Sequence, residues 1–219
     1  MEPKNGTRTS VHSFDVYGVI VNEEKAGRQI VDLFRETSQG DLPEEIIEER
    51  VKDYQALLRK GQGALTRKAE ILNQVYSYAL ERGAKVDLAK SLYPDALETF
   101  AGILEGGQQI TILGSKKFDT EALPKDIKER MTMNVYGGPK NNQGTFVHVA
   151  NEIENLGGRL VSHSEDTLLE LKTAESTGII KPENLVQVVR NGAGSPLVSN
   201  DGYSRVKELR TEDYLGRVI

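Results

Sequence analysis

The strongest constraint on the fold is a change of pattern along this chain of 219 residues. A short apolar and β-branched segment, 11–21, stands near the start and is followed by a long stretch of helical periodicity. From residue 91 onward, short apolar segments alternate with helical ones. Because strands that alternate with helices build parallel sheets covered on both faces, this pattern predicts an α/β fold.

The helical stretch predicts an inserted domain. Ile47, Val51, Tyr54 and Leu58 recur at three- and four-residue steps there, which is the spacing of one helix face. No strand pattern interrupts the stretch. We therefore expect a doubly wound parallel-sheet core made of 1–21 and 91–219, with a helical domain at 22–90 inserted after the first strand.

Charge and composition exclude several classes of function. The 28 Lys and Arg residues are outnumbered by 33 Asp and Glu, for a formal charge of −5, which argues against a nucleic-acid binder. No apolar run approaches the roughly 20 residues of a membrane span, and the polar first ten residues lack the apolar segment of a signal peptide. The absence of cysteine fits a reducing compartment. We expect a cytoplasmic protein that binds neither nucleic acid nor membranes.

Polar residues follow the predicted strands, and in an open α/β sheet such residues gather at the carboxyl edge. Asp15 comes directly after Phe14 in the first strand segment. A carboxylate there can act as a nucleophile or bind a cation, while an Asp that closes a turn through its own side chain is an equally good interpretation of this segment alone.

Two further strand ends carry candidate site residues. After the apolar run 109–113, Gly114, Ser115 and Lys116 offer backbone N–H groups and a hydroxyl to an oxyanion, although a plain strand-to-helix turn predicts the same residues. After the strand predicted at 159–162, the segment 162–166 (SHSED) offers metal-binding oxygens or an imidazole nitrogen. Helix capping by Ser or Asp is the simpler explanation of that last segment.

Lys140 follows Gly-Gly-Pro in a loop before a predicted helix. Most loop lysines are merely solvated, but this one could bring a fixed positive charge to a site that contains Asp15. The order of these residues along the chain favours a shared functional site over the separate structural explanation of each residue. A carboxylate follows the first strand, small polar residues follow the second, a lysine comes next, and acidic residues follow a later strand.

This order, together with the segment 14–19 (FDVYGV), resembles the haloacid dehalogenase (HAD) superfamily of hydrolases over nearly the whole chain. The segments 92–97 (LYPDAL), 138–140 (GPK) and 186–192 (VQVVRNG) are most similar to the enolase-phosphatases of that superfamily. The resemblance implies a HAD-like core and identifies 22–90 as the helical cap that closes over small substrates.

The resemblance also implies roles for individual residues. Asp15 would be the nucleophile that forms a covalent aspartyl intermediate, and Lys140 would orient it and balance charge on the transferring group. Ser115 would serve the second motif, with Gly114 and Lys116 beside the substrate. A Mg²⁺ ion would be held by Asp15 together with Glu165 or Asp166.

Departures from the family pattern leave alternatives open. Tyr17 stands where phosphatases carry a second acid, two residues after the nucleophile, and the loss of that acid should lower the rate roughly 10²–10⁴-fold. Tyrosine at that place is similar to the branch that hydrolyses 2-haloacids without a metal, where the tyrosine lies beside the substrate. Val19 replaces the usual threonine, and His163 stands in place of the principal metal-binding aspartate.

We therefore expect a hydrolase that acts on a small anionic metabolite, with a phosphate monoester as the leading substrate class. The first alternative is a metal-independent 2-haloacid dehalogenase, motivated by Tyr17. The second is a catalytically inactive relative that binds an anion or a protein through the same cleft, since a fold without an intact site does not define an activity. Both a monomer and a homodimer are compatible with the sequence.

Overall fold

The computed structural model describes residues 8–59, 74–190 and 203–216. The chain divides into two compact units, one made of 1–21 and 92–219 and the other of 22–91. Within the described residues, no helix combines the length and the apolar character that crossing a membrane requires.

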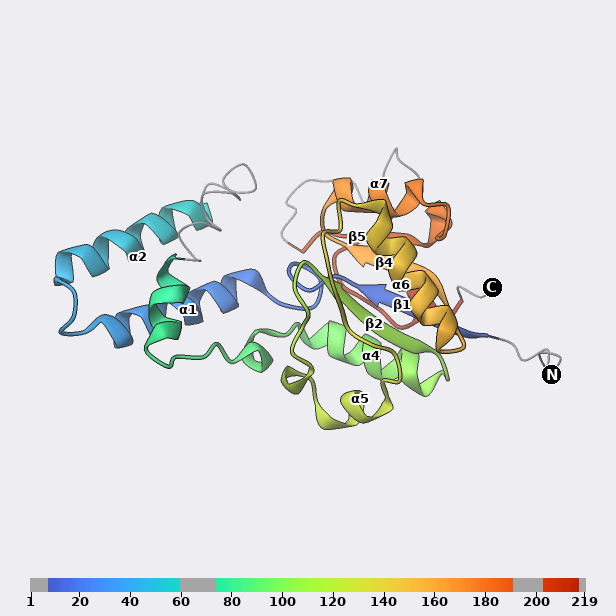
Figure 1. Cartoon of the computed structure of the whole chain (residues 1–219), viewed down its shortest axis with the longest axis horizontal. Helices are drawn as coiled ribbons and strands as arrows, with labels where there is room; N and C mark the ends of the chain where they lie inside the picture. Colours follow the sequence, from blue (N-terminus) through green and yellow to red (C-terminus); the bar gives the residue numbers. More distant parts are fainter. Residues whose placement is uncertain (1–7, 60–73, 191–202, 217–219) are drawn as a thin grey trace. The chain divides into compact units, whose positions relative to one another are not determined.

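A six-stranded parallel sheet forms the centre of the first unit (Figure 1). Its strand order, β3-β2-β1-β4-β5-β6, places the first strand in the middle. The strands are β1 (Thr9–Phe14), β2 (Gln109–Gly114), β3 (Tyr136–Gly137), β4 (Gly158–Glu165), β5 (Leu185–Val188) and β6 (Ser204–Val206).

Helices cover both faces of this sheet, as Figure 1 shows. α6 and α7 pack on β4, and α4 packs on β2. Their starts carry ordinary capping chemistry: Pro94 occupies the first turn of α4, and the Asn142 side chain accepts a hydrogen bond from the backbone N–H of Gly144 at the start of α6. The helices of this unit are α4 (Pro94–Glu105), α5 (Lys125–Arg130), α6 (Gln143–Asn155), α7 (Leu168–Ser176) and α8 (Glu212–Leu215), with short 3₁₀ turns at η3 (Thr120–Ala122) and η4 (Pro182–Asn184).

The alternation of β1 side chains explains how one strand serves two apolar layers. Val11 belongs to a buried cluster with Phe146 of α6 and Leu171 of α7. Phe14, on the opposite face, lies 4.8 Å from the ring of Phe100 in α4. The two faces together bury every residue of β1 except the half-buried Thr9, as expected for the central strand of a parallel sheet.

The second unit is helical and has its own apolar cluster. Phe34 of α1 packs with Ile47 and Val51 of α2 and with Val75. The Asn22 side chain caps α1 by accepting a hydrogen bond from the backbone N–H of Lys25. Its described elements are α1 (Glu23–Ser38), α2 (Glu44–Arg59), a helical segment at 74–81 and the 3₁₀ turn η2 (Leu88–Ser91).

Two expected boundaries were wrong. The strand expected at 11–21 ends at Phe14, because the chain then folds into a turn in which the N–H groups of Ile20 and Val21 donate to the carbonyl of Val16. The strand expected at 159–162 continues through Glu165, and α7 begins at Leu168.

Candidate active site

Asp15 lies at the carboxyl edge of the sheet, between the ends of β2 and β4. The preceding Phe14 is aligned with Ile112 of β2 and with Ser164 of β4. The backbone N–H of Asp15 donates to the carbonyl of Ser164 at 2.9 Å, which continues the β1–β4 pairing by one residue. The residue is 5% exposed, so its carboxylate is held in a buried position by the strands themselves.

Lys140, from the loop before α6, brings its ammonium into this position. Its Nζ lies 2.5 Å from Oδ1 of Asp15, 2.6 Å from Oε2 of Glu165 and 2.6 Å from Oε2 of Glu170. Lys140 and Asp15, which are far apart in sequence, are therefore in direct contact. The lysine is 6% exposed, so this ion cluster is largely shielded from solvent.

Burial, followed by the charge of Glu165, raises the pKa of Asp15 to about 8, even though Lys140 acts in the opposite direction. At neutral pH the protonated form of this carboxyl is therefore favoured. A nucleophile must be ionised, so a further positive charge beside Asp15 would be needed to prepare it for attack.

Glu165 and Lys140 remain charged. Burial alone would raise the pKa of Glu165, but His163 and Lys140 hold it well below its ordinary range. Burial alone would lower the pKa of Lys140, but the carboxylates of Asp15 and Glu165 raise it above its ordinary value. The pair formed by Glu165 and Lys140 is thus a fixed ion pair at the base of the site.

Three acidic side chains form a set that could hold a cation. Asp15, Glu165 and Asp166 each offer an oxygen, and these atoms lie within 4.8 Å of one another. Carboxylate oxygens are the ligands that hard divalent ions prefer. Gly18 has a φ of +77°, and a Cβ at that position would lie 2.5 Å from Oδ2 of Asp166, so only glycine lets the turn after β1 approach the acid.

The last residue of β2 is Gly114, directly before Ser115, the serine that was assigned to the second motif. Gly114 is buried, and a Cβ there would lie 2.7 Å from Cγ2 of Val16, so a serine does not fit. Ser115 and Lys116 follow it and are exposed. Their predicted roles beside the substrate stay predictions.

Tyr17 and His163 occupy different surroundings. Tyr17 is 46% exposed. His163 is fully buried in β4, with Nδ1 2.9 Å from Oγ of Ser13, and burial lowers its pKa. Its Nε2 lies 3.6 Å from Oε2 of Glu165, and through this contact His163 lowers the pKa of that glutamate. The acids that surround Asp15 are therefore Glu165 and Asp166 rather than a residue at position 163.

Glu170 is the residue of this cluster that sequence reasoning missed. It lies in the first turn of α7, three residues after the N-cap Thr167, where a glutamate usually reaches back to the N-cap N–H. That ordinary role hides it in the sequence. In the structure, the backbone N–H of Thr167 donates to Oε1 of Glu165 instead, and Glu170 contacts Lys140.

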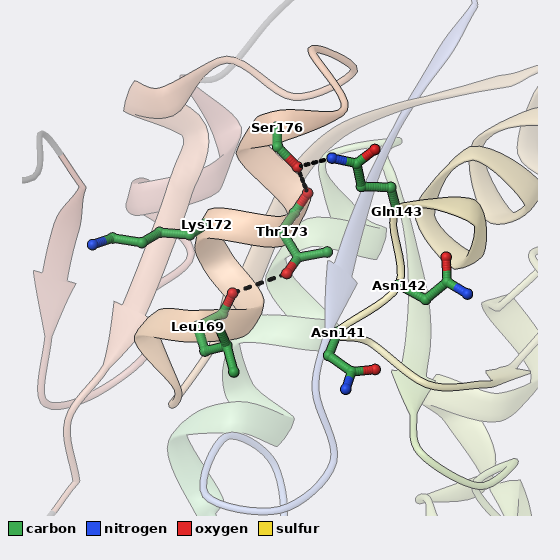
Figure 2. A pocket seen from close by; sticks show the side chains of 7 residues that line it. All are labelled: Asn141, Asn142, Gln143, Leu169, Lys172, Thr173 and Ser176. Carbon is green, nitrogen blue, oxygen red and sulfur yellow. Dashed lines mark hydrogen bonds between the residues drawn. The ribbon is translucent and has the colours of Figure 1, made fainter.

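The structure also has a pocket of about 650 Å³. Its lining residues are close in sequence to Lys140 and Glu170, but it is not lined by the residues of the ion cluster. Figure 2 shows it between α7 and the segment that leads into α6, where Gln143 donates a hydrogen bond to Oγ of Ser176 at 2.7 Å. The side chain of Lys172 points away from the asparagines of the opposite wall. The lining residues are Asn141, Asn142, Gln143, Leu169, Lys172, Thr173 and Ser176.

Comparison with known proteins identifies the fold. No family model and no curated protein matches the sequence. Among solved structures, a Thermotoga maritima protein that carries the name β-phosphoglucomutase matches with a TM-score of 0.58 and 17% identity, over 94% of this chain and 97% of that one. The magnesium-bound HAD hydrolase YfnB of Bacillus subtilis matches with a TM-score of 0.55 and 16% identity, over 92% and 95% of the two chains.

A 2-haloacid dehalogenase from Pseudomonas syringae matches with a TM-score of 0.54 and 10% identity, over 91% of this chain and 94% of that one. These neighbours are HAD-superfamily hydrolases, and at such identities the likeness is one of fold. The predicted fold class, a HAD-like α/β core with a parallel sheet, is confirmed.

Proposed function

We propose that this chain is a hydrolase of the HAD superfamily that acts on a small anionic metabolite, with phosphate monoesters as the leading class. The observation that carries the proposal is the 2.5 Å contact between Oδ1 of Asp15 and Nζ of Lys140 at the carboxyl edge of the sheet. Once ionised, a buried carboxylate can attack an electrophile, and the fixed ammonium beside it can stabilise the charge that develops.

In the proposed reaction, an oxygen of Asp15 forms a bond to phosphorus as the bond from phosphorus to the leaving oxygen breaks. Water then attacks phosphorus, which releases inorganic phosphate and restores the carboxylate. Lys140 holds the nucleophile in place and balances negative charge during both steps. In this proposal, residues 22–91 act as a cap that excludes bulk water from the reaction.

The donor set of Asp15, Glu165 and Asp166 fits Mg²⁺, because it consists of carboxylate oxygens within 4.8 Å of one another. When bound, such an ion supplies the additional positive charge that favours ionised Asp15 and offsets the charge of a phosphate group. The magnesium-bound state of YfnB, which shares the fold, supports this cofactor.

Tyr17 narrows the choice of substrate. It stands where an acid would protonate the leaving oxygen, and a phenol is a much weaker acid than a carboxyl group. Phosphate compounds whose leaving group needs no protonation, such as acyl and aryl phosphates, should therefore be the best substrates.

The same residue supports a second candidate, hydrolysis of a 2-haloacid, because halide leaves without a proton. The shared fold of the Pseudomonas syringae 2-haloacid dehalogenase is compatible with that candidate. In this second reaction, Asp15 of the present chain would displace halide from carbon, and water would then attack the carboxyl carbon of the resulting ester.

The test is a substrate panel of acyl, aryl and alkyl phosphates and 2-haloacids, with and without Mg²⁺. We expect phosphate release that depends on Mg²⁺, with a rate lowered by roughly 10³-fold or more in Asp15→Asn. Halide release without metal would instead support the dehalogenase. If neither product forms, the enzymatic proposal fails and a binding protein remains.

Isotope labelling separates the two reactions independently of rate. In a single turnover in H₂¹⁸O, a phosphatase places the label in released phosphate, because water attacks phosphorus. A dehalogenase places it in the carboxylate of Asp15, because water attacks carbon.

A further inference from the structure

The contact between Glu170 and Lys140 lies at the most exposed part of the ion cluster. Oε2 of Glu170 lies 2.6 Å from Nζ of Lys140, and the glutamate side chain is 25% exposed, against 6% for the lysine. The ammonium of Lys140 is thus buried, whereas the carboxylate of Glu170 that contacts it is partly exposed to solvent.

The ammonium of Lys140 already has as many acceptors as donors. A lysine offers three N–H groups, and carboxylate oxygens of three residues lie 2.5–2.6 Å from Nζ. An anionic group of a substrate can contact Lys140 only if one of these carboxylates moves away.

Two of the three are fixed. Asp15 is 5% exposed, so its carboxyl group has little solvent to turn into. Glu165 is fully buried, and its Oε1 accepts hydrogen bonds from the N–H groups of Asp166 and Thr167 at 3.0 and 3.2 Å. Movement of the Glu165 carboxylate would leave these two N–H groups unsatisfied.

Glu170 is the carboxylate that can leave. It projects from the first turn of α7 and its partly exposed side chain can turn into water without loss of solvation. The capping position that a glutamate would ordinarily take is already filled by Glu165, so the helix does not depend on Glu170.

We propose that Glu170 sets the affinity of the site for anions: it occupies, as an internal anion, the place on Lys140 that the anionic group of a substrate takes, and a ligand must displace it. This rests on the proposed function in that Lys140 is taken as the anion-binding group. Because the competitor is part of the chain, it lowers the affinity of every anion that takes its place by the same factor.

The experiment measures binding of inorganic phosphate to the full chain by titration calorimetry, with Mg²⁺ present. Glu170→Gln keeps the shape but removes the charge that competes for Lys140, so we expect phosphate to bind roughly five- to twentyfold more tightly. Glu170→Asp keeps the charge on a shorter side chain and should give a smaller gain. Acetate should gain by the same factor as phosphate in Glu170→Gln, because both anions displace the same carboxylate.

Glu183→Gln is the matched control, because it removes one exposed charge from the turn after α7 and should leave phosphate affinity unchanged. Equal gains in Glu170→Gln and Glu183→Gln would overturn the proposal in favour of a general charge effect. An unchanged or weaker affinity in Glu170→Gln would also overturn it.

Lys140→Met distinguishes this failure from failure of the proposed function. If wild-type protein binds phosphate and Lys140→Met does not, but Glu170→Gln behaves as wild type, only the role of Glu170 is wrong. If phosphate binds to neither wild type nor Glu170→Gln, both proposals fail, because removal of the competing carboxylate should expose an anion site.

Discussion

Asp15 combines a buried position with a nearby like charge, and this makes stability depend on pH. Its pKa of about 8 in the folded chain exceeds its ordinary value of 3.8. Between those values the folded state binds more protons at this site than the unfolded state, so the free energy of unfolding falls as pH rises. The contribution is fully present below about pH 4 and is lost as pH rises through 8.

Asp15→Asn should remove this dependence. In the absence of divalent ions, we expect the difference in unfolding free energy between variant and wild type to grow in favour of the variant from pH 5 to pH 8, by up to about 1.4 kcal/mol per pH unit. Glu165 does not interfere, because its lowered pKa affects stability only below its ordinary value of 4.5. Urea denaturation across this range is the measurement, and a constant difference would contradict it.

The individual residues of the site differ in how far sequence could predict them. Asp15 and Lys140 stand out because a carboxylate after a strand and a lysine in a glycine-rich loop share a recognisable order. Glu170 does not, because a glutamate three residues after a threonine has an ordinary role as a helix cap. Only the three-dimensional position of Lys140 shows that it serves another purpose.

At the scale of elements, Arg190 connects three segments of the sheet-containing unit. Its Nη1 lies 2.5 Å from Oδ2 of Asp95 at the start of α4, and its Nη2 donates to the carbonyl of Val19 at 2.7 Å. The guanidinium also lies over the ring of Tyr93, 4.0 Å from its centroid. These contacts fix the turn after β1, and with it the chain that follows Asp15.

Arg190→Met should therefore destabilise the protein by about 3–5 kcal/mol, because it leaves the partly buried Asp95 carboxylate without its cation. Asp95→Asn should cost less, since an amide oxygen still accepts hydrogen bonds from Arg190 and from the N–H of Leu209. Urea denaturation of both variants checks this, with the exposed Arg159→Met as a control. Equal, small losses in all three would show that the contact is not structural.

The same scale shows why element boundaries were harder to predict than element types. The helix predicted after Lys140 is α6 (Gln143–Asn155), whose apolar residues repeat at helical spacing behind an asparagine cap. β4 was expected to end at Ser162, because the polar residues that follow are typical of loops. It continues because those residues find buried partners: His163 contacts Ser13, and Ser164 contacts Tyr214.

At the scale of the whole molecule, the sequence pattern predicts the fold class because alternation of strands and helices leaves few arrangements. Two strands had no such pattern: β3 is only two residues long and lies in the segment before Lys140 that was predicted as a loop, and β6 is three residues long and all are partly exposed. The second unit has a separate apolar cluster around Phe34, so it does not depend on the sheet for its core. No repeating pattern in its sequence indicates which substrate it would admit.

The central claim is that Asp15 itself becomes covalently bonded to the substrate while Lys140 balances the charge. The most direct measurement is to quench the protein during turnover of an aryl or acyl phosphate and to map the mass of the peptide that contains residue 15. We predict one added phosphoryl group on Asp15 in the wild type and none in Asp15→Asn. Phosphate release at the wild-type rate by Asp15→Asn, with no modified peptide in either protein, would contradict the account.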